Sequence, residues 1–299
     1  ARLRTHRRGF QLVRSIAVPV LSSAIDQALN LADSMEARST TQNPVSEINL
    51  RNISFNYEAD KPILNSIDFK AEPGSITVVH GNTGCGKSTL LNMGAGLSKP
   101  SSGIVKVGGE VVQGPNKHVA FMLQKDLLMP WRTIAQNVEF GLELRGVAAS
   151  VRREVSERLL VQCHLKGFGG YYPSQLSGGM RQRAAMARTL AVDPLVLLMD
   201  EPFSALDAQT KMILQQDLAQ TVRANGKTVV FITHDLAEGV ALSDRILVMS
   251  ERPGTIVEEI VVDIPDRENP MQRRKNARVG EFVAHLMDLL KLDAQSDVH

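Results

Sequence analysis

The chain has 299 residues and is 43% hydrophobic, which is enough to bury the core of one large domain. Its formal net charge of +2 and its 4% of aromatic residues give no electrostatic or stacking basis for binding nucleic acid, so no nucleic-acid partner is expected. Two cysteines, Cys85 and Cys163, are typical of a reducing compartment and not of a disulfide framework.

Residues 1–45 are predicted to form a basic, amphipathic helical extension that ends in a linker. Apolar residues recur at helical spacing between positions 16 and 31, and a polar run at 39–44 indicates the linker. The basic start is not followed by an uncharged apolar core, so we expect no secretory signal. No run of about 18 apolar residues occurs, so a role at a membrane would require docking on another subunit.

Residues 46–265 show the pattern of an α/β domain. Strands are predicted at 48–55, 63–71, 76–80, 104–107, 110–113, 119–123, 195–199, 228–233 and 245–249. Gly108 and Gly109 indicate a hairpin among the early strands, which we expect to form an antiparallel subdomain. Helical patterns at 151–165, 179–192 and 206–223 separate the later strands, as in a mainly parallel sheet. Residues 134–192 are predicted to be largely a helical subdomain inserted in this core.

Residues 266–299 are predicted to be a charged and then helical tail. An apolar stripe at helical spacing should pack on the core. Its members are Val279, Phe282, Val283, Leu286, Leu289 and Leu290.

A glycine-rich loop at 81–88 matches the phosphate-binding pattern G-x-x-x-x-G-K-S and follows a strand pattern. Its glycines let backbone N–H groups wrap phosphates, and the helix that follows adds a positive N-terminus. We expect Lys87 to neutralise the β- and γ-phosphates, Ser88 to bind Mg²⁺ and Thr89 to donate to an α-phosphate. Cys85 is interpreted as a small loop residue, with redox sensing as the alternative. The predicted nucleotide-binding residues of the loop are Gly81, Asn82, Thr83, Gly84, Cys85, Gly86, Lys87, Ser88 and Thr89.

Two acids follow the apolar run at 195–199. Asp200 should stand at the carboxyl end of a strand, where open α/β sheets bind ligands, and is predicted to hold Mg²⁺. Glu201 would point in another direction and suits a general base that polarises the attacking water. A solvated surface pair is the alternative, but the preceding strand and the Pro202 that follows favour the site.

Three further motifs complete a recognisable set: Leu-Ser-Gly-Gly-Met at 176–180, Ser-Ala-Leu-Asp at 204–207 and Thr-His-Asp at 233–235. With the loop and the two acids, they closely resemble the ATP-binding-cassette (ABC) ATPases over about 46–265. The resemblance implies an α/β P-loop NTPase core with an N-terminal antiparallel β-subdomain and an inserted helical subdomain. It also implies an ATPase that dimerises, with itself or a related subunit, around two ATP molecules.

The resemblance assigns roles to residues that spacing alone leaves uninterpreted. Gln124 would sense Mg²⁺ and the attacking water, and His234 would contact the γ-phosphate and orient that water. Tyr57 would stack on adenine. The alternatives are a structural histidine at 234, a sheet-edge tyrosine at 57, and Phe55 as the stacking residue.

The signature at 176–180 would act on the site of a second subunit. Ser177, Gly178 and Gly179 would contact the γ-phosphate held by the partner, since a serine hydroxyl and glycine N–H groups at a helix N-terminus form an anion cradle. Asp207 would couple the two sites. Met180 stands where the family more usually has glutamine, and we expect closure on ATP to survive this departure.

The segment 125–131 is similar to one found in ABC importers of the nitrate, sulfonate and taurine type, where Leu-Leu-x-Pro-Trp follows the glutamine loop. It implies a groove for the permease subunits, a peripheral location on the cytoplasmic face of the inner membrane, and an extracytoplasmic solute-binding protein. Trp131, the only tryptophan, is predicted to be an interface anchor, with a core position as the alternative.

Residues 28–39 weakly resemble the end of the transmembrane subunit of energy-coupling-factor importers, where an Ala-Arg-Gly-like motif occurs and this chain has Ala-Arg-Ser. The alternatives to a small-anion importer are therefore the ATPase of a vitamin or metal importer of that type, or an ABC ATPase outside transport. A P-loop kinase would not need 176–180 or His234.

Overall fold

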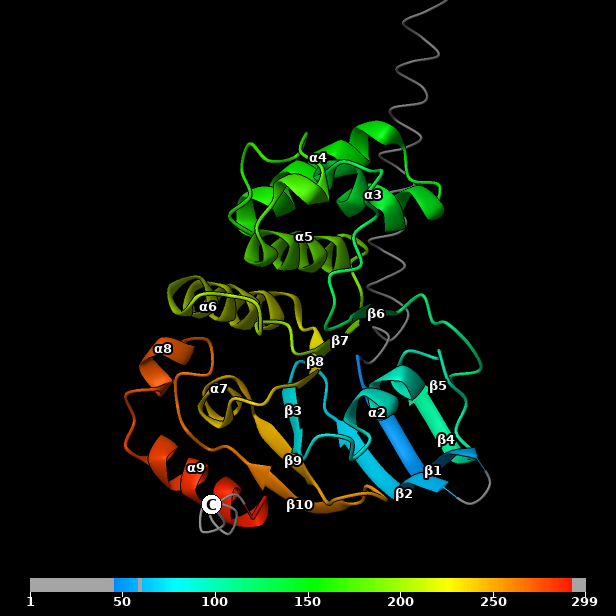
Figure 1. The fold of residues 1–299 in the computed structure, drawn as a ribbon, viewed down its shortest axis with the longest axis vertical. Helices are drawn as coiled ribbons and strands as arrows, with labels where there is room; N and C mark the ends of the chain where they lie inside the picture. Colours follow the sequence, from blue (N-terminus) through cyan, green and yellow to red (C-terminus); the bar gives the residue numbers. More distant parts are fainter. Residues whose placement is uncertain (1–45, 59–60, 292–299) are drawn as a thin grey trace, which may run out of the picture. The chain divides into compact units, whose positions relative to one another are not determined.

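The computed structural model describes residues 46–58 and 61–291, which belong to one compact unit (Figure 1). The extension predicted at 1–45, and with it the motif at 28–39, lies outside the described residues. Among the described residues, no helix combines the length and the apolar character that crossing a membrane requires.

An antiparallel sheet carries the start of the unit. Its strands are β1 (Ile48–Glu58), β2 (Lys61–Ala71), β4 (Ser102–Val107) and β5 (Glu110–Val111), in the order β2-β1-β4-β5. Gly108 and Gly109 both have positive φ (59° and 83°), which a tight hairpin between β4 and β5 requires and glycine adopts at little cost. The predicted hairpin is confirmed, although β5 is shorter than the predicted strand.

A second, mainly parallel sheet forms the centre. Its strands are β3 (Ile76–Gly81), β6 (Val119–Met122), β7 (Val196–Asp200), β8 (Thr228–Ile232), β9 (Arg245–Met249) and β10 (Ile256–Val261), in the order β10-β9-β3-β8-β7-β6. Only β10, which the sequence pattern did not predict, is antiparallel to its neighbour. Half of its residues are exposed at the sheet edge, so its apolar pattern is weak.

Both faces of the central sheet are covered. Successive residues of one strand enter different cores, as Leu197 and Leu198 do, because side chains alternate between the faces. One core lies against α2 (Lys87–Gly94) and the antiparallel sheet. The other lies against α6 (Ala208–Asn225) and α7 (Leu236–Leu242) (Figure 1). This arrangement explains why β3, β7 and β8 are buried along their whole length.

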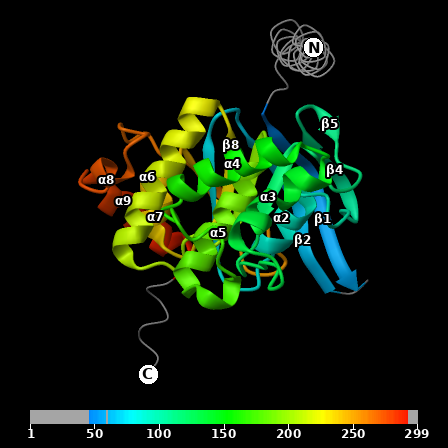
Figure 2. The same cartoon turned by 90° about the horizontal axis from the view of Figure 1, so that it is seen from above.

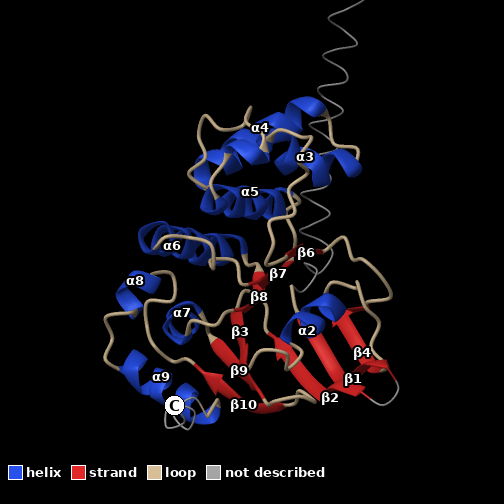
Figure 3. Cartoon of the chain, in the orientation of Figure 1, coloured by secondary structure: helices blue, strands red, loops and turns tan. Residues whose placement is uncertain are grey.

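The connection from β6 to β7 is helical, consisting of α3 (Ile134–Leu144), α4 (Ala149–Gln162), the short 3₁₀ helix η1 (Pro173–Gln175) and α5 (Gly178–Ala191). The three α-helices pack against one another, and α5 also contacts β6 of the central sheet (Figures 2 and 3). A capping box between Thr133 and Gln136 fixes the start of α3.

The C-terminal helices α8 (Pro270–Arg273) and α9 (Arg278–Leu289) belong to the same compact unit. Val279, Leu286 and Leu290 are buried in the core, and the other members of the predicted stripe pack beside them, so its packing is confirmed. Arg273 is only 1% exposed and donates to the carbonyl oxygens of Ala241, Ser243, Val262 and Ile264, which fastens α8 to the end of α7.

Candidate functional site

Four neighbouring parallel strands end at one edge of the central sheet. The glycine-rich loop follows β3, Gln124 follows β6, Glu201 follows β7 and His234 follows β8. The carboxyl ends of parallel strands meet at the same edge, so residues far apart in sequence become neighbours.

The glycine-rich loop turns directly into α2, whose first residue is Lys87. Gly84 and Gly86 have φ of 83° and 110°, values that a side chain would strain. A Cβ on Gly86 would also lie 2.6 Å from the Cδ2 atom of Leu64, on β2. The Lys87 ammonium donates to the carbonyl oxygens of Gly81 (2.6 Å) and Asn82 (2.9 Å), so its charge lies within the loop.

Cys85 is 1% exposed and packs where space is limited. A Cβ added to Gly81 would lie 2.8 Å from the sulfur of Cys85, and a Cβ on Gly254 would lie 2.2 Å from the carbonyl oxygen of Cys85. The burial supports the interpretation of a small packing residue, because redox-sensing thiols need solvent access.

Asp200 ends β7 beside Ser88 of α2. The Ser88 hydroxyl is close enough to the Asp200 carboxyl to influence its pKa. Burial raises the pKa of Asp200, and the neighbouring Glu201 carboxylate adds to that rise, while the Ser88 hydroxyl and Lys87 oppose it. A carboxylate and a hydroxyl side by side fit Mg²⁺, which takes one or two protein oxygens and completes its shell with water and phosphate. The described residues contain no denser cluster of three or more potential metal-binding acids, histidines or cysteines.

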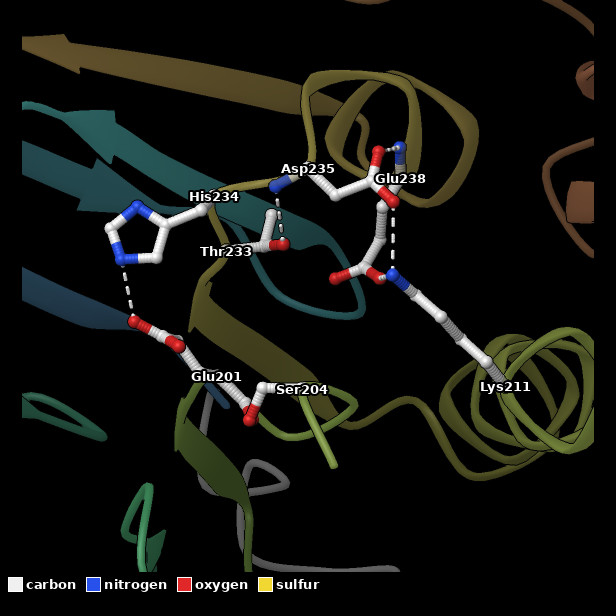
Figure 4. Close-up of a pocket in the computed structure, with 7 residues that line it drawn as sticks. All are labelled: Glu201, Ser204, Lys211, Thr233, His234, Asp235 and Glu238. Carbon is white, nitrogen blue, oxygen red and sulfur yellow. Dashed lines mark hydrogen bonds and ion pairs between the residues drawn. The ribbon is translucent and has the colours of Figure 1, made fainter. Parts of the chain in front are cut away.

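Glu201 is held from two sides. The amide Nε2 of Gln124 donates to one carboxylate oxygen at 3.0 Å, and the Nε2 atom of His234 lies 2.6 Å from the other. Glu201 has φ of +50°, an uncommon conformation for a non-glycine residue, and its N–H donates to the carbonyl of Ile232 on β8. The backbone therefore leaves the strand line just after Asp200, and the Glu201 side chain reaches toward His234 (Figure 4).

Tyr57 lies near the end of β1 and is 67% exposed, whereas Phe55 is 8% exposed and meets the Tyr57 ring edge-on at 4.8 Å. Only Tyr57 therefore offers a free ring face. The pairing of β1 with β4 ends at Ser54, so the sheet edge is open on that side at Tyr57, and both the adenine-stacking role and the sheet-edge alternative stay predictions. Phe55 pairs with Leu64, the residue that packs on Gly86, which places the end of β1 beside the phosphate loop.

The signature segment begins α5. Ser177 is its N-cap and accepts from the N–H of Met180 at 3.3 Å. Ser177 and Gly178 are exposed, and Met180 packs partly buried against the core. The start of α5 approaches the backbone of Ala205 closely at Gly179, where a Cβ atom would lie 3.3 Å from the Ala205 carbonyl oxygen.

Asp207 is the N-cap of α6 and accepts from the N–H of Thr210 at 2.9 Å. Its hydrogen bonds with Thr210 lower the pKa of its carboxyl group, which is exposed.

Trp131 is 74% exposed, so the alternative of a core tryptophan is wrong. Leu127 of the same segment is 55% exposed. The backbone beneath is held firmly, because Arg188 of α5 donates to the carbonyl oxygens of Asp126 (2.6 Å) and Leu127 (2.7 Å), and Arg181 binds the Asp126 carboxylate at 3.0 Å.

Several residues around the site were not predicted. Lys211, Asp235 and Glu238 line a pocket together with Glu201, Ser204, Thr233 and His234 (Figure 4). His80, just before the glycine-rich loop, is 1% exposed, and its Nε2 atom has no hydrogen-bond partner among the described residues. Lys211, Asp235 and Glu238 lie at helix starts, where acids and lysines are too common to indicate a site. His80 is part of the mainly apolar strand β3, so its residue type alone gave no signal.

Comparison with known proteins shows the family to which the chain belongs. Residues 64–204 match the family model described as ABC transporter. The chain is 44% identical over 228 residues to an uncharacterised ABC transporter ATP-binding protein of Methanocaldococcus jannaschii, covering 76% of this chain and 84% of the relative.

Two other relatives have names that state a transported compound. A taurine import ATP-binding protein of Yersinia pestis is 41% identical (77% of this chain, 91% of the relative). A nitrate import ATP-binding protein of Synechocystis is 42% identical (77% and 87%).

Solved structures match as well. A bacterial ABC transporter cassette solved as a dimer has a TM-score of 0.67 and 29% identity, covering 72% of this chain and 98% of the cassette. A dimeric post-hydrolysis state bound to ADP and phosphate has a TM-score of 0.66, with the same identity and coverage. The phosphate loop, the paired acids, the glutamine and the histidine meet at one edge of the sheet, and the relatives match over most of their length. The chain therefore belongs to the ATP-binding, ATP-hydrolysing subunits of ABC transporters.

Proposed function

We propose that this chain is the ATPase subunit of an ABC importer and works as a dimer that closes around two ATP molecules. The observation that carries the proposal is the position of Glu201 between Gln124 and His234, at the sheet edge that also holds the phosphate loop. A carboxylate oriented by two neighbours can accept a proton from water in a fixed direction.

In the proposed reaction, Glu201 takes a proton from a water molecule as the water oxygen attacks the γ-phosphorus. The bond from that phosphorus to the bridging oxygen breaks, and ADP leaves. Lys87, at the start of α2, offsets charge on the β- and γ-phosphates, and Tyr57 supports the adenine ring. Ser88 and Asp200 would hold Mg²⁺, with Gln124 nearby; the ion would neutralise phosphate charge when bound.

The second subunit completes each site in this proposal. Ser177 and Gly178 are exposed at the N-terminus of α5, where free N–H groups attract anions. The partner's γ-phosphate is the anion that we place there, with Asp207 transmitting closure between the sites. The dimeric cassettes among the structural relatives support this arrangement.

The exposed segment 125–131 is the proposed contact with the permease subunits. Trp131 and Leu127 expose large apolar side chains on one short segment, as contact residues of an interface do. Arg188 of α5 holds this segment to the helix that carries the signature. A push on this segment would therefore move Ser177 as well. The subunit would sit on the cytoplasmic face of the inner membrane.

The proposed cargo is a small anion such as nitrate, a sulfonate or taurine, delivered by an extracytoplasmic solute-binding protein. The relatives that import taurine and nitrate support this class, and so does the Leu-Leu-Met-Pro-Trp segment. Uptake of labelled nitrate or taurine by vesicles that hold the complex would support it. Uptake of a vitamin or metal ion instead would favour the energy-coupling-factor alternative, and retention on ribosomes without a permease would favour an ATPase outside transport.

The test of the hydrolytic site is Glu201→Gln. We expect turnover to fall by about 10²–10⁴, the usual contribution of a general base, while ATP binding persists and a dimer accumulates on a sizing column. Glu110→Gln, at an exposed position of β5, is the matched control and should retain turnover. Wild-type turnover in Glu201→Gln would refute the assignment of the base.

A further inference from the structure

Lys211 binds two acids of the element that follows His234. It lies in the first turn of α6, with its ammonium 2.9 Å from the Oδ2 atom of Asp235 and 2.5 Å from the Oε2 atom of Glu238 (Figure 4). The lysine side chain is only 21% exposed, so the contacts are partly shielded from water. Ion pairs in such a setting are screened less than those on the open surface.

We define residues 233–235, which contain His234, as the switch loop. Asp235 is the residue of this loop that binds Lys211. Its Oδ1 atom caps α7 by accepting from the N–H of Glu238 at 2.9 Å, and its Oδ2 atom takes Lys211. Its own N–H donates to the Thr233 hydroxyl at 3.1 Å. The residue on each side of His234 is therefore fixed, and the lysine holds one of them.

Glu238 makes the lysine hard to replace. Its side chain is 2% exposed, and its contacts are Lys211 and the amide Nε2 of Gln215 at 2.9 Å. A buried carboxylate that loses its cation must take up a proton or move toward water. Since Glu238 lies in the first turn of α7, either response would disturb the start of that helix and the loop before it.

Lys211 also connects the switch loop to the proposed dimer contact. Its backbone N–H donates to the carbonyl oxygen of Asp207 at 2.9 Å, so the same residue is bound to the N-cap of α6 and, through its side chain, to Asp235. A displacement of the Asp207 backbone would therefore be transmitted to the switch loop through Lys211 alone.

We propose that Lys211 is a positioning residue for ATP hydrolysis: by holding Asp235 and Glu238, it fixes the switch loop so that His234 reaches Glu201. This rests on the proposed roles of His234 and Glu201. Lys211 acts through the histidine and touches neither the nucleotide nor the attacking water.

The experiment compares Lys211→Met with Lys227→Met. Lys227 is a matched lysine at the opposite end of β8, where it is 10% exposed and binds Asp193 at 2.6 Å and the carbonyl of Pro194 at 2.9 Å. Both variants remove the ammonium group of a mostly buried lysine and an ion pair with it, but only Lys211→Met loosens the switch loop. We expect Lys211→Met to lower kcat by about tenfold or more with KM for ATP almost unchanged, and Lys227→Met to retain kcat.

Two further variants separate positioning from folding. Lys211→Arg keeps the charge and should restore most of the lost kcat. Asp235→Asn keeps a capping oxygen for α7 but loses the charge facing Lys211, and it should lower kcat in the same way if Lys211→Met does not fold. Wild-type kcat in Lys211→Met, or an equal loss in Lys227→Met, would overturn the proposal.

A double variant distinguishes this proposal from the proposed function. If Lys211 acts through His234, adding Lys211→Met to His234→Ala should cause little further loss of kcat. A full additional loss in the double variant would overturn the positioning role while leaving the role of His234 intact. Wild-type turnover in His234→Ala alone would instead overturn the hydrolytic site on which the proposal rests.

Discussion

The Nε2 atom of His234 lies 2.6 Å from one oxygen of the Glu201 carboxylate, and the amide of Gln124 binds the other oxygen at 3.0 Å. The three residues come from the ends of three different strands, β8, β7 and β6. Each carboxylate oxygen keeps a second lone pair for another donor, such as a water molecule. The orientation of Glu201 is thus set before any substrate enters.

Gln124 should matter for turnover more than for nucleotide affinity. We expect Gln124→Ala to lower kcat by about tenfold to a hundredfold, because Glu201 loses one of its two orienting contacts and small misplacements of a reacting group are costly. Phosphate release would be measured at saturating ATP, with binding of a fluorescent ATP analogue as the control. A variant with reduced affinity and unchanged kcat would contradict this prediction.

Two inactive variants should complement each other if the signature acts on the partner's site. Lys87→Ala disables the phosphate loop of its own subunit, and Ser177→Arg blocks the exposed start of α5. A mixed dimer of the two keeps one site with both parts intact, so the mixture should hydrolyse ATP faster than either variant alone. Each variant mixed with itself is the control. An inactive mixture of folded proteins would contradict an intersubunit site.

Trp131 should contribute to assembly and little to stability. Because it is 74% exposed, Trp131→Ala should change the free energy of unfolding by no more than about 0.5 kcal/mol. We expect the isolated subunit to keep its ATPase activity and to lose co-purification with the permease. Leu144→Ala, at the last residue of α3, is a matched control, since Leu144 is 73% exposed. Equal loss of assembly in both variants would argue against a specific contact at 125–131.

His80 should make the folded state sensitive to acid. Burial lowers the pKa of His80 from its usual 6.5 to about 4. The charges of Lys87 and His234 lower it further, and the contact with the Thr233 backbone opposes the shift. As the pH falls below 6.5, the unfolded chain binds this proton first, so stability declines until the pH reaches about 4. The total loss from this group is on the order of 3 kcal/mol.

Urea unfolding at a series of pH values would measure this loss. His80→Leu removes the group, so the free energy of unfolding of the variant should fall less steeply than that of the wild type across the same interval. Above pH 6.5 the two curves should run parallel. Parallel curves throughout would show that His80 is not the group responsible.

Gly239 should tolerate no side chain while His80 is present. A Cβ at Gly239 would lie 2.3 Å from the Nε2 atom of His80, whose ring is buried and has little room to move. We expect Gly239→Ala to cost about 1–3 kcal/mol of stability, as overpacking in a core usually does. The double variant with His80→Ala should be more stable than the sum of the single effects predicts, because the new methyl group enters the space left by the ring. Additive effects in thermal unfolding would contradict a direct contact.

Much of the fold follows from patterns of short range. The run at 195–199 is apolar throughout because β7 is covered on both faces, and the glycines at 108 and 109 indicate the hairpin by their backbone freedom. The edge strand β10 was not predicted, since its exposed residues weaken the periodicity. Lys211 gave no sequence signal either, because its two partners lie on another helix and only folding brings them within reach.

The sequence by itself determined the kind of chemistry. A glycine-rich loop before a helix, and acids after an apolar run, depend on residue types and near spacing, which the linear chain records directly. Only the tertiary structure decided how the parts meet: that Glu201 lies between Gln124 and His234, that Trp131 faces solvent, and that Lys211 holds the switch loop. The physical reason is that parallel strands bring their carboxyl ends together from distant points in the chain, and burial and ion pairing depend on neighbours that the local sequence does not specify.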